Sequence, residues 1–97
     1  MRKYEIMIIV TPEMDERQVT PLLERYLKII TDGGGTVDEY DFWGKRRFAY
    51  EIQKKAEGFY AVANVTAKPE DVKELDRQLG INEQIMRTKV LRPELHR

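Results

Sequence analysis

The side chains that most often perform catalysis are scarce in this sequence of 97 residues. Cysteine is absent, which excludes disulfides, iron–sulfur clusters, cysteine-ligated zinc and thiol nucleophiles. The single histidine, His96, is the penultimate residue, where no neighbour would orient the imidazole as a base or metal ligand. Carboxylates are numerous, but they lack the spacing of a calcium-binding loop, and no nucleophile or base accompanies them. We therefore predict no catalytic residue, no metal site and no cofactor.

Three consecutive glycines at residues 33–35 could suggest a phosphate-binding loop. Such a loop follows a strand and precedes a helix, so that the amides at the helix N-terminus point at the anion. Here the order is reversed, because the glycines follow a helical pattern and precede a strand pattern. We predict that they form a helix cap and a turn.

Basic side chains are the remaining candidates for a functional site. The 17 Lys and Arg residues are balanced by 17 Asp and Glu residues, and this zero net charge alone argues against nucleic-acid binding. The charges are unevenly placed, however. Residues 44–55 contain five basic residues and one acidic residue, and residues 84–97 contain four and one, whereas residues 11–43 contain three and eight. We expect basic strands and acidic helices, with the two signs on different sides of the molecule.

Two interpretations of the basic strands remain open. Basic strands with interleaved aromatic residues are typical of an RNA-binding sheet. Alternatively, the charges are solvated edge residues that prevent pairing with other chains, and the aromatic residues belong to the core. The segment from Glu57 departs from the RNA-recognition-motif signature, because Ala61 and Asn64 replace stacking aromatics, so stacking of bases is not favoured. The candidate RNA-binding residues are Arg2, Lys3, Lys45, Arg46, Arg47, Lys54, Lys55, Arg87, Lys89 and Arg92.

The hydrophobic pattern predicts the elements that position these residues. Strands are expected at residues 4–10, 36–43, 45–52, 59–67 and 84–92, with a bulge or kink at Gly44 and a polar turn at residues 53–58. A first helix is expected to end at residues 31–35, and a second to run from Pro69 to Gly80. Pro21 leaves the start of the first helix open. It begins at Thr20 with Pro21 in its first turn, or a frayed turn from Asp15 precedes it.

This order of elements predicts an α+β, ferredoxin-like βαββαβ fold, in which a four-stranded antiparallel sheet carries both helices on one face. We expect residues 1–97 to form a single domain, with residues 93–97 as a short frayed tail. The opposite face of the sheet is left uncovered. It carries apolar residues that prefer cover, and we predict that a protein partner contacts them. These residues are Met7, Ile9, Tyr60 and Val62.

Four segments resemble a known family. They are Trp43–Ile52 (Trp-Gly-Lys-Arg-Arg-Phe-Ala-Tyr-Glu-Ile), the opening Met1–Ile6, Glu57–Tyr60 and Leu75–Leu79. They are similar to those of bacterial small-subunit ribosomal protein number six, the bS6 family, and most similar to members from high-GC Gram-positive bacteria, the actinobacteria. The resemblance extends from residue 1 to about residue 92.

The resemblance implies a ferredoxin-like fold without enzymatic activity, in a cytoplasmic, ribosome-bound protein with no membrane or small-molecule partner. It implies binding to the central domain of small-subunit ribosomal RNA, together with small-subunit ribosomal protein number eighteen in a heterodimer. Arg46 and Arg47 match the basic pair of the family, and Arg2 and Lys3 match its basic N-terminal positions. The alternatives are a regulatory or ligand-binding module that dimerises through its sheet and a small hydrolase of the same fold.

Overall fold

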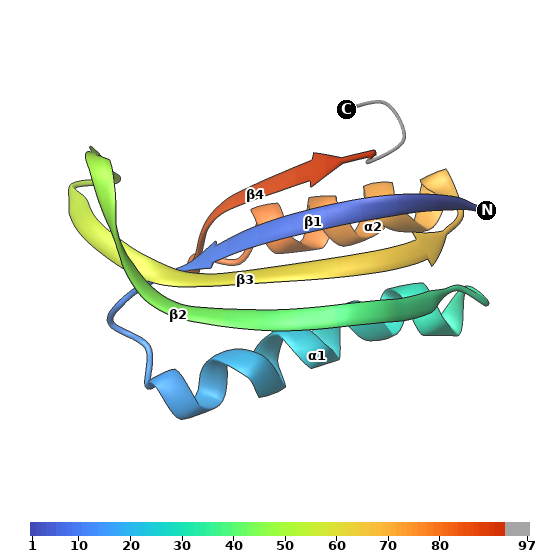
Figure 1. Ribbon diagram of the computed structural model, residues 1–97, viewed down its shortest axis with the longest axis horizontal. Coiled ribbons are helices and arrows are strands. Elements are labelled where there is room, and N and C mark those ends of the chain that lie inside the picture. The colour runs from blue at the N-terminus through green and yellow to red at the C-terminus, as the bar shows by residue number, and fades with distance from the viewer. Residues whose placement is uncertain (93–97) are drawn as a thin grey trace.

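The computed structural model describes residues 1–92, so the predicted frayed tail at residues 93–97 lies outside the described residues. The elements are β1 (Arg2–Val10), α1 (Glu16–Asp32), β2 (Thr36–Ile52), β3 (Lys55–Ala67), α2 (Pro69–Gly80) and β4 (Ile85–Leu91). The strands form one sheet in the order β2-β3-β1-β4, and each neighbouring pair is antiparallel. Both helices cover the same face of this sheet (Figure 1). The predicted ferredoxin-like fold is confirmed.

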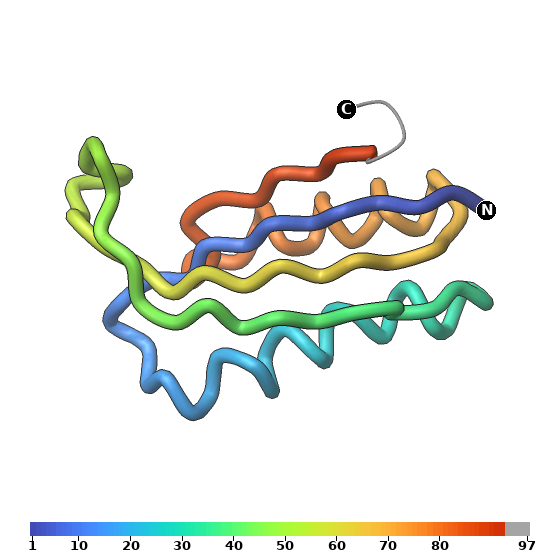
Figure 2. Tube along the Cα trace, viewed as in Figure 1, coloured from blue at the N-terminus to red at the C-terminus, as the bar shows by residue number. Residues whose placement is uncertain are grey.

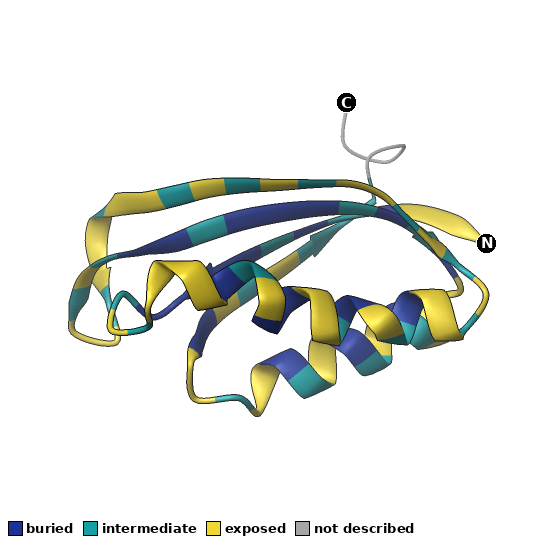
Figure 3. Cartoon of the chain, turned by 90° about the horizontal axis from the view of Figure 1, so that it is seen from below, coloured by how far each residue is buried: buried dark blue, intermediate teal, exposed yellow. Residues whose placement is uncertain are grey.

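Strict alternation along the two central strands builds the core. Alternate residues of β1 and β3 face the helices and are buried; they are Tyr4, Ile6, Ile8, Val10, Phe59, Ala61, Ala63, Val65 and Ala67. The helices contribute apolar stripes with helical spacing, namely Val19, Leu22, Leu23, Leu27 and Ile30 of α1, and Val72, Leu75 and Leu79 of α2. The buried stripes line the side of each helix that faces the sheet (Figure 3). Neither helix of the described chain is long and apolar enough to cross a membrane.

Helix α1 begins before its proline. The Asp15 carboxylate caps the helix by accepting a 2.9 Å hydrogen bond from the backbone N–H of Arg17, and Pro21 lies inside the helix. The structure therefore selects the start at Asp15 over the start at Thr20. The cap and the complete burial of Val19 hold the first turn in place and compensate for the hydrogen bond that Pro21 removes.

The glycine segment caps α1 as predicted. Gly34 has the left-handed φ of 89°, and the N–H of Gly35 donates to the Ile30 carbonyl at 2.9 Å. A Cβ atom on Gly35 would collide with the Thr66 carbonyl oxygen of β3, so the chain enters β2 very close to its neighbour.

The β2–β3 hairpin is longer than expected. The predicted bulge at Gly44 is confirmed, because the register shifts between Phe42 and Gly44 and Gly44 has a φ of 83°. The predicted turn at residues 53–58 is wrong. Ile52 pairs with Lys55, so only Gln53 and Lys54 form the turn, both with left-handed φ (53° and 64°). Strand pairing here overrides the polar composition from which a longer turn was inferred.

The hairpin extends past the rest of the sheet. The last β1 residue, Val10, pairs with Phe59, whereas β2 and β3 continue to Ile52 and Lys55. The projecting part bends out of the plane of the sheet, away from the helices (Figure 2). This bend determines where several of the candidate residues lie.

Candidate functional site

The ten predicted RNA-binding residues form three groups rather than one patch. Arg2 and Lys3 begin β1, and Arg92 follows β4 at the same end of the sheet. The five residues of the hairpin, Lys45, Arg46, Arg47, Lys54 and Lys55, lie at the opposite end of the long axis (Figure 1). Arg87 and Lys89 lie on β4, on the face of the sheet that the helices leave uncovered. We call this side the open face.

The hairpin cations differ in what they contact. The Lys45 ammonium lies 3.9 Å from a Glu57 carboxylate oxygen and 5.2 Å from the centre of the Phe59 ring. Lys55 forms an ion pair with Glu13, in the loop before α1, and this interaction lowers the pKa of the Glu13 carboxyl below its usual range. Two of the five hairpin cations are therefore neutralised within the molecule.

The other three cations of the hairpin have no acidic partner among residues 1–92. Arg46, Arg47 and Lys54 are exposed, and no ion pair in the described part of the chain involves them. Their charges are available to a ligand. Sequence reasoning could not separate them from Lys45 and Lys55, since Glu13 and Lys55 are 42 residues apart.

The open face carries the four predicted partner residues, but two of them are already buried. Met7 pairs with Val62, and Ile9 with Tyr60, so all four share this face. Met7 and Tyr60 are half-buried, whereas Ile9 is 4% exposed and Val62 8% exposed. The expectation that all four are uncovered and available to a partner is therefore corrected. Of the four, Met7 and Tyr60 keep accessible surface.

The bent hairpin covers Ile9. The side-chain amide of Gln53 donates to the Met86 carbonyl oxygen at 3.3 Å, which ties the turn to β4. Gly58 leaves room for this bend, because a Cβ atom there would lie 2.9 Å from Ile9 Cγ2 and 3.0 Å from Phe48 Cζ. No sequence pattern indicated this cover, since alternation predicted a sheet face that is open along its full length.

An aromatic cluster occupies the open face beside Met7. The Trp43 and Tyr60 rings are parallel with centres 6.4 Å apart, and Phe48 lies at 5.9 Å from Tyr60 in a tilted geometry. Trp43 is 41% exposed, and its indole N–H donates to an Asp41 carboxylate oxygen at 3.1 Å. Tyr60 thus already stacks within the protein, which agrees with the absence of RNA-recognition stacking positions in β3.

The first half of β2 is acidic, which corrects the expected charge separation. Asp38, Glu39 and Asp41 lie on a strand and not on a helix, so basic strands facing acidic helices describe only part of the molecule. Both oxygens of Asp38 accept from hydroxyl groups, that of Thr66 at 2.6 Å and that of Thr36 at 2.7 Å. These hydrogen bonds, led by that from Thr66, lower the pKa of Asp38 below its usual range, so it is charged at neutral pH.

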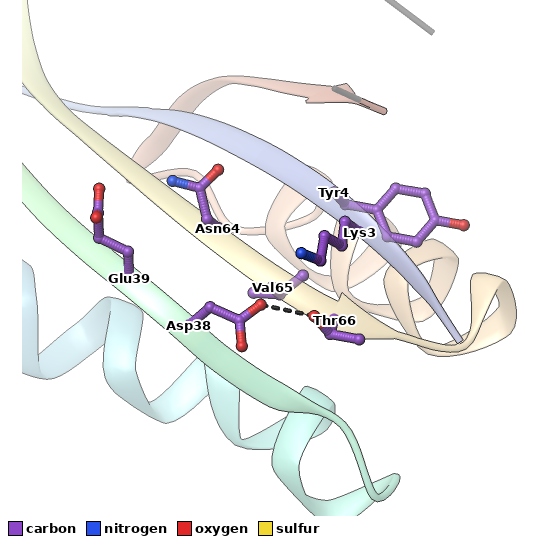
Figure 4. A pocket seen from close by; sticks show the side chains of 7 residues that line it. All are labelled: Lys3, Tyr4, Asp38, Glu39, Asn64, Val65 and Thr66. Carbon is purple, nitrogen blue, oxygen red and sulfur yellow. Dashed lines mark hydrogen bonds between the residues drawn. The ribbon is translucent and has the colours of Figure 1, made fainter. Parts of the chain in front are cut away.

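Asp38 and Glu39 border a depression of about 370 Å³ on the open face (Figure 4). Its lining includes Asp38, Glu39, Asn64 and Thr66, with Lys3 on its far side. Sequence reasoning missed it, because alternation places the neighbours Asp38 and Glu39 on opposite faces of a regular strand and gives no sign of the bulge in β2 that lies between Val37 and Glu39. Among the described residues, no group of three His, Cys, Asp or Glu side chains is arranged to hold a metal ion.

Comparison with known proteins identifies the family. The family model of ribosomal protein S6 matches residues 3–92. The chain belongs to the ribosomal protein S6 family. It is 64% identical to small ribosomal subunit protein bS6 of Cutibacterium acnes over 96 residues, which are 99% of this chain and 100% of that protein. It is 55% identical to bS6 of Streptomyces coelicolor with the same coverage. The predicted likeness to actinobacterial members is confirmed.

A solved structure agrees with this assignment. The crystal structure of 30S ribosomal protein S6 from Thermotoga maritima superimposes with a TM-score of 0.86 at 35% identity, covering 94% of this chain and 86% of that chain. The chain is therefore a protein of the small ribosomal subunit, where it associates with ribosomal RNA. Ribosomal proteins are generally structural components and not enzymes.

Proposed function

We propose that this protein binds the central domain of small-subunit ribosomal RNA through the end of its β2–β3 hairpin and docks ribosomal protein S18 on its open face. The observation that carries the proposal is the set of three exposed cations on the hairpin, Arg46, Arg47 and Lys54, which have no acidic partner within the described chain.

Phosphate binding by these side chains would position the protein on RNA without reading its bases. Arginine guanidinium groups bind phosphate oxygens in a forked geometry, and each such interaction releases condensed counterions from the nucleic acid. The two-residue turn at Gln53 and Lys54 makes the hairpin narrow, and it projects past β1 and β4. A narrow basic projection of this kind fits into a concave RNA surface that is too narrow for the rest of the protein.

The second part of the proposal concerns the open face. Trp43 is 41% exposed, and Met7 and Tyr60 beside it are half-buried, so apolar surface remains available there. A protein partner gains free energy by covering such surface, whereas a solvated RNA backbone does not. Met7 and Tyr60, whose cross-strand neighbours on the same face are the buried Val62 and Ile9, are the residues that we assign to the interface with S18.

RNA binding is tested with the double variant Arg46→Ala and Arg47→Ala. Affinity for a central-domain RNA fragment, with S18 present, is measured at several salt concentrations. We expect weaker binding and a salt dependence that is shallower by about one unit for each phosphate that the variant no longer binds. The matched control is Arg17→Ala with Arg77→Ala, because both arginines lie on helices in ion pairs with Asp15 and Glu74. An unchanged salt slope in the hairpin variant, or an equal effect in the control, would exclude this role for the hairpin.

A further inference from the structure

The two edge strands present opposite charges on the open face. One register row across the sheet reads Asp41, Val62, Met7, Lys89, from β2 through β3 and β1 to β4. The neighbouring rows each contribute a charge to one edge only, because the row of Glu39 ends at Leu91 on β4 and the row of Arg87 ends at Gly44 on β2. Glu39 extends the acidic edge on β2, and Arg87 extends the basic edge on β4. The open face therefore has negative charge at its β2 edge and positive charge at its β4 edge, with apolar residues between the two edges.

The opposite charges do not neutralise each other. Four strands place β2 and β4 about 14 Å apart, which exceeds the Debye length of about 8 Å at physiological salt. No ion pair in the described chain involves Glu39, Asp41, Arg87 or Lys89. All four of these charged residues are exposed. Each edge can therefore attract its own counter-charge on a bound partner.

The open face has a depression near each charged edge, and the charged residues that line the two depressions differ in sign. The one of about 370 Å³ at the acidic edge is bordered by Asp38 and Glu39 (Figure 4). The other, of about 220 Å³, is lined by the cations of Arg87 and Lys89 together with the side chains of Met7, Ile9, Ile52 and Tyr60. Two cations beside apolar side chains suit a carboxylate that lies next to a hydrophobic side chain.

We propose that the open face recognises an extended protein segment that crosses its strands in one direction only. The segment places an acidic residue at Arg87 and Lys89, apolar side chains over Met7 and Tyr60, and a basic residue at Glu39 and Asp41. This inference rests on the proposed function, since the segment belongs to the protein that docks there. It moves Arg87 and Lys89 from the predicted RNA-binding set to the protein interface.

The same charges disfavour RNA on this face. A polyanion crossing the sheet would meet Glu39 and Asp41, and Asp38 beyond them, at an edge where like charges repel. Tyr60 offers no free ring for a base, because Trp43 and Phe48 pack against it. A protein segment carries both signs of charge, and a nucleic acid backbone carries one.

Two charge reversals test the inference with S18 as the probe. The acidic edge is reversed in Glu39→Lys with Asp41→Lys, and the basic edge in Arg87→Glu with Lys89→Glu. Binding of S18 is measured by calorimetry at low and at moderate salt. We expect each reversal to weaken binding by about tenfold or more, with a smaller difference at moderate salt, because both edges attract opposite charge on the partner.

Matched reversals on the helices control for net charge. Glu70→Lys with Asp76→Lys, and Arg25→Glu with Lys28→Glu, alter the charge by the same amounts at exposed positions of α2 and α1. They should leave S18 affinity unchanged. Neutral variants (Glu39→Gln with Asp41→Asn, and Arg87→Gln with Lys89→Gln) should give smaller decreases in affinity, and they replace any reversal that fails to fold.

The outcomes separate the inference from the proposed function. If the wild-type protein does not bind S18, the proposed function fails and this inference fails with it. If S18 binds and both reversals leave its affinity unchanged, only the inference fails. If reversal of the acidic edge raised the affinity for RNA and reversal of the basic edge lowered it, the open face would be an RNA-binding surface. Self-association of the wild type, abolished in both reversals, would make the occupant a second copy of this chain. Either result overturns the inference.

Discussion

The two faces of the sheet bury apolar side chains by different means. On the helix face, alternate residues of β1 from Tyr4 to Val10 are buried under α1 and α2. On the open face, cover comes from the chain's own hairpin at one end, which buries Ile9, while Met7 stays half-buried in the middle. Folding buries the apolar side chains of the helix face, but it buries those of the open face only in part. A partner can bury the apolar surface that remains.

Charge distinguishes the faces as clearly as burial does. The residues of β1 and β3 that are buried under the helices are all hydrophobic, so the buried part of that face presents no charged group that a ligand could recognise. The open face combines Asp41, Glu39, Arg87 and Lys89 with an apolar strip between them. Because the helix face specifies the fold, the residues of the open face are available for another role. In this chain they carry the charged and apolar groups that a partner can recognise.

Neighbouring residues of β1 allow the sharpest test of this difference. Ile8→Ala removes a side chain that is 1% exposed on the helix face, and we expect it to lower the free energy of unfolding by about 2–5 kcal/mol. Met7→Ala removes a half-buried side chain on the open face, with an expected decrease of about 1 kcal/mol. Denaturant unfolding measures both. Equal decreases would mean that Met7 is part of the core and that the open face is not reserved for a partner.

The covered end of the open face is tested at Gly58. A Cβ atom there would lie 3.0 Å from the Val10 carbonyl oxygen and 2.9 Å from Ile9 Cγ2, so Gly58→Ala forces the hairpin away from β1. We expect the unfolding free energy to fall by about 1–3 kcal/mol, and hydrogen exchange between Lys45 and Tyr60 to become faster. The hydrogen bond between Gln53 and Met86 should weaken as well.

Gly80 provides the control for this substitution. It ends α2, and a Cβ atom there meets nothing within 4 Å. Gly80→Ala should stabilise the protein by about 0.4–1 kcal/mol through the entropy of the unfolded chain. If Gly58→Ala behaves like Gly80→Ala, the hairpin does not pack on Ile9, and the contrast between the two ends of the open face disappears.

The helix face could be predicted from the sequence because its information is local. Alternation in β1 and β3 and the helical spacing of Val19, Leu22 and Leu23 each depend on residues a few positions apart, and burial follows directly from them. The bulge at Gly44 and the cap at Gly34 are local as well, since each depends on a glycine at a left-handed φ. A short stretch of sequence is therefore enough to place these features correctly.

The open face could not be predicted to the same degree because its interactions join residues that are distant in sequence. Lys55 meets Glu13, and Gln53 meets Met86, so neither the neutralised cation nor the covered end follows from any short segment. Counting charge along the chain groups the acidic residues of β2 with α1, although they lie on a strand. Pairing order, and not composition, brings them opposite the cations of β4.

The smallest expected effect concerns the charge of the open face and tests how its acidic edge is held. Thr66→Val removes the 2.6 Å hydrogen bond to Asp38 and keeps the shape of the side chain. Because this bond is the main cause of the lowered pKa of Asp38, the pKa should rise toward its ordinary value, as an NMR titration of the carboxyl carbon would show.

The sign of the effect on stability follows from the lowered pKa. A carboxyl whose folded-state pKa is depressed stabilises the protein above its unfolded pKa, and this stabilisation disappears as the pH falls through the folded value. Thr66→Val should therefore destabilise the protein more at pH 7 than in acid below both pKa values. Thr88→Val is the matched control, because the buried Thr88 hydroxyl has no hydrogen-bond partner among the described residues. Its removal should be neutral or slightly stabilising at every pH. A pH-independent effect of Thr66→Val would show that packing, and not the charge of Asp38, holds this edge of the open face.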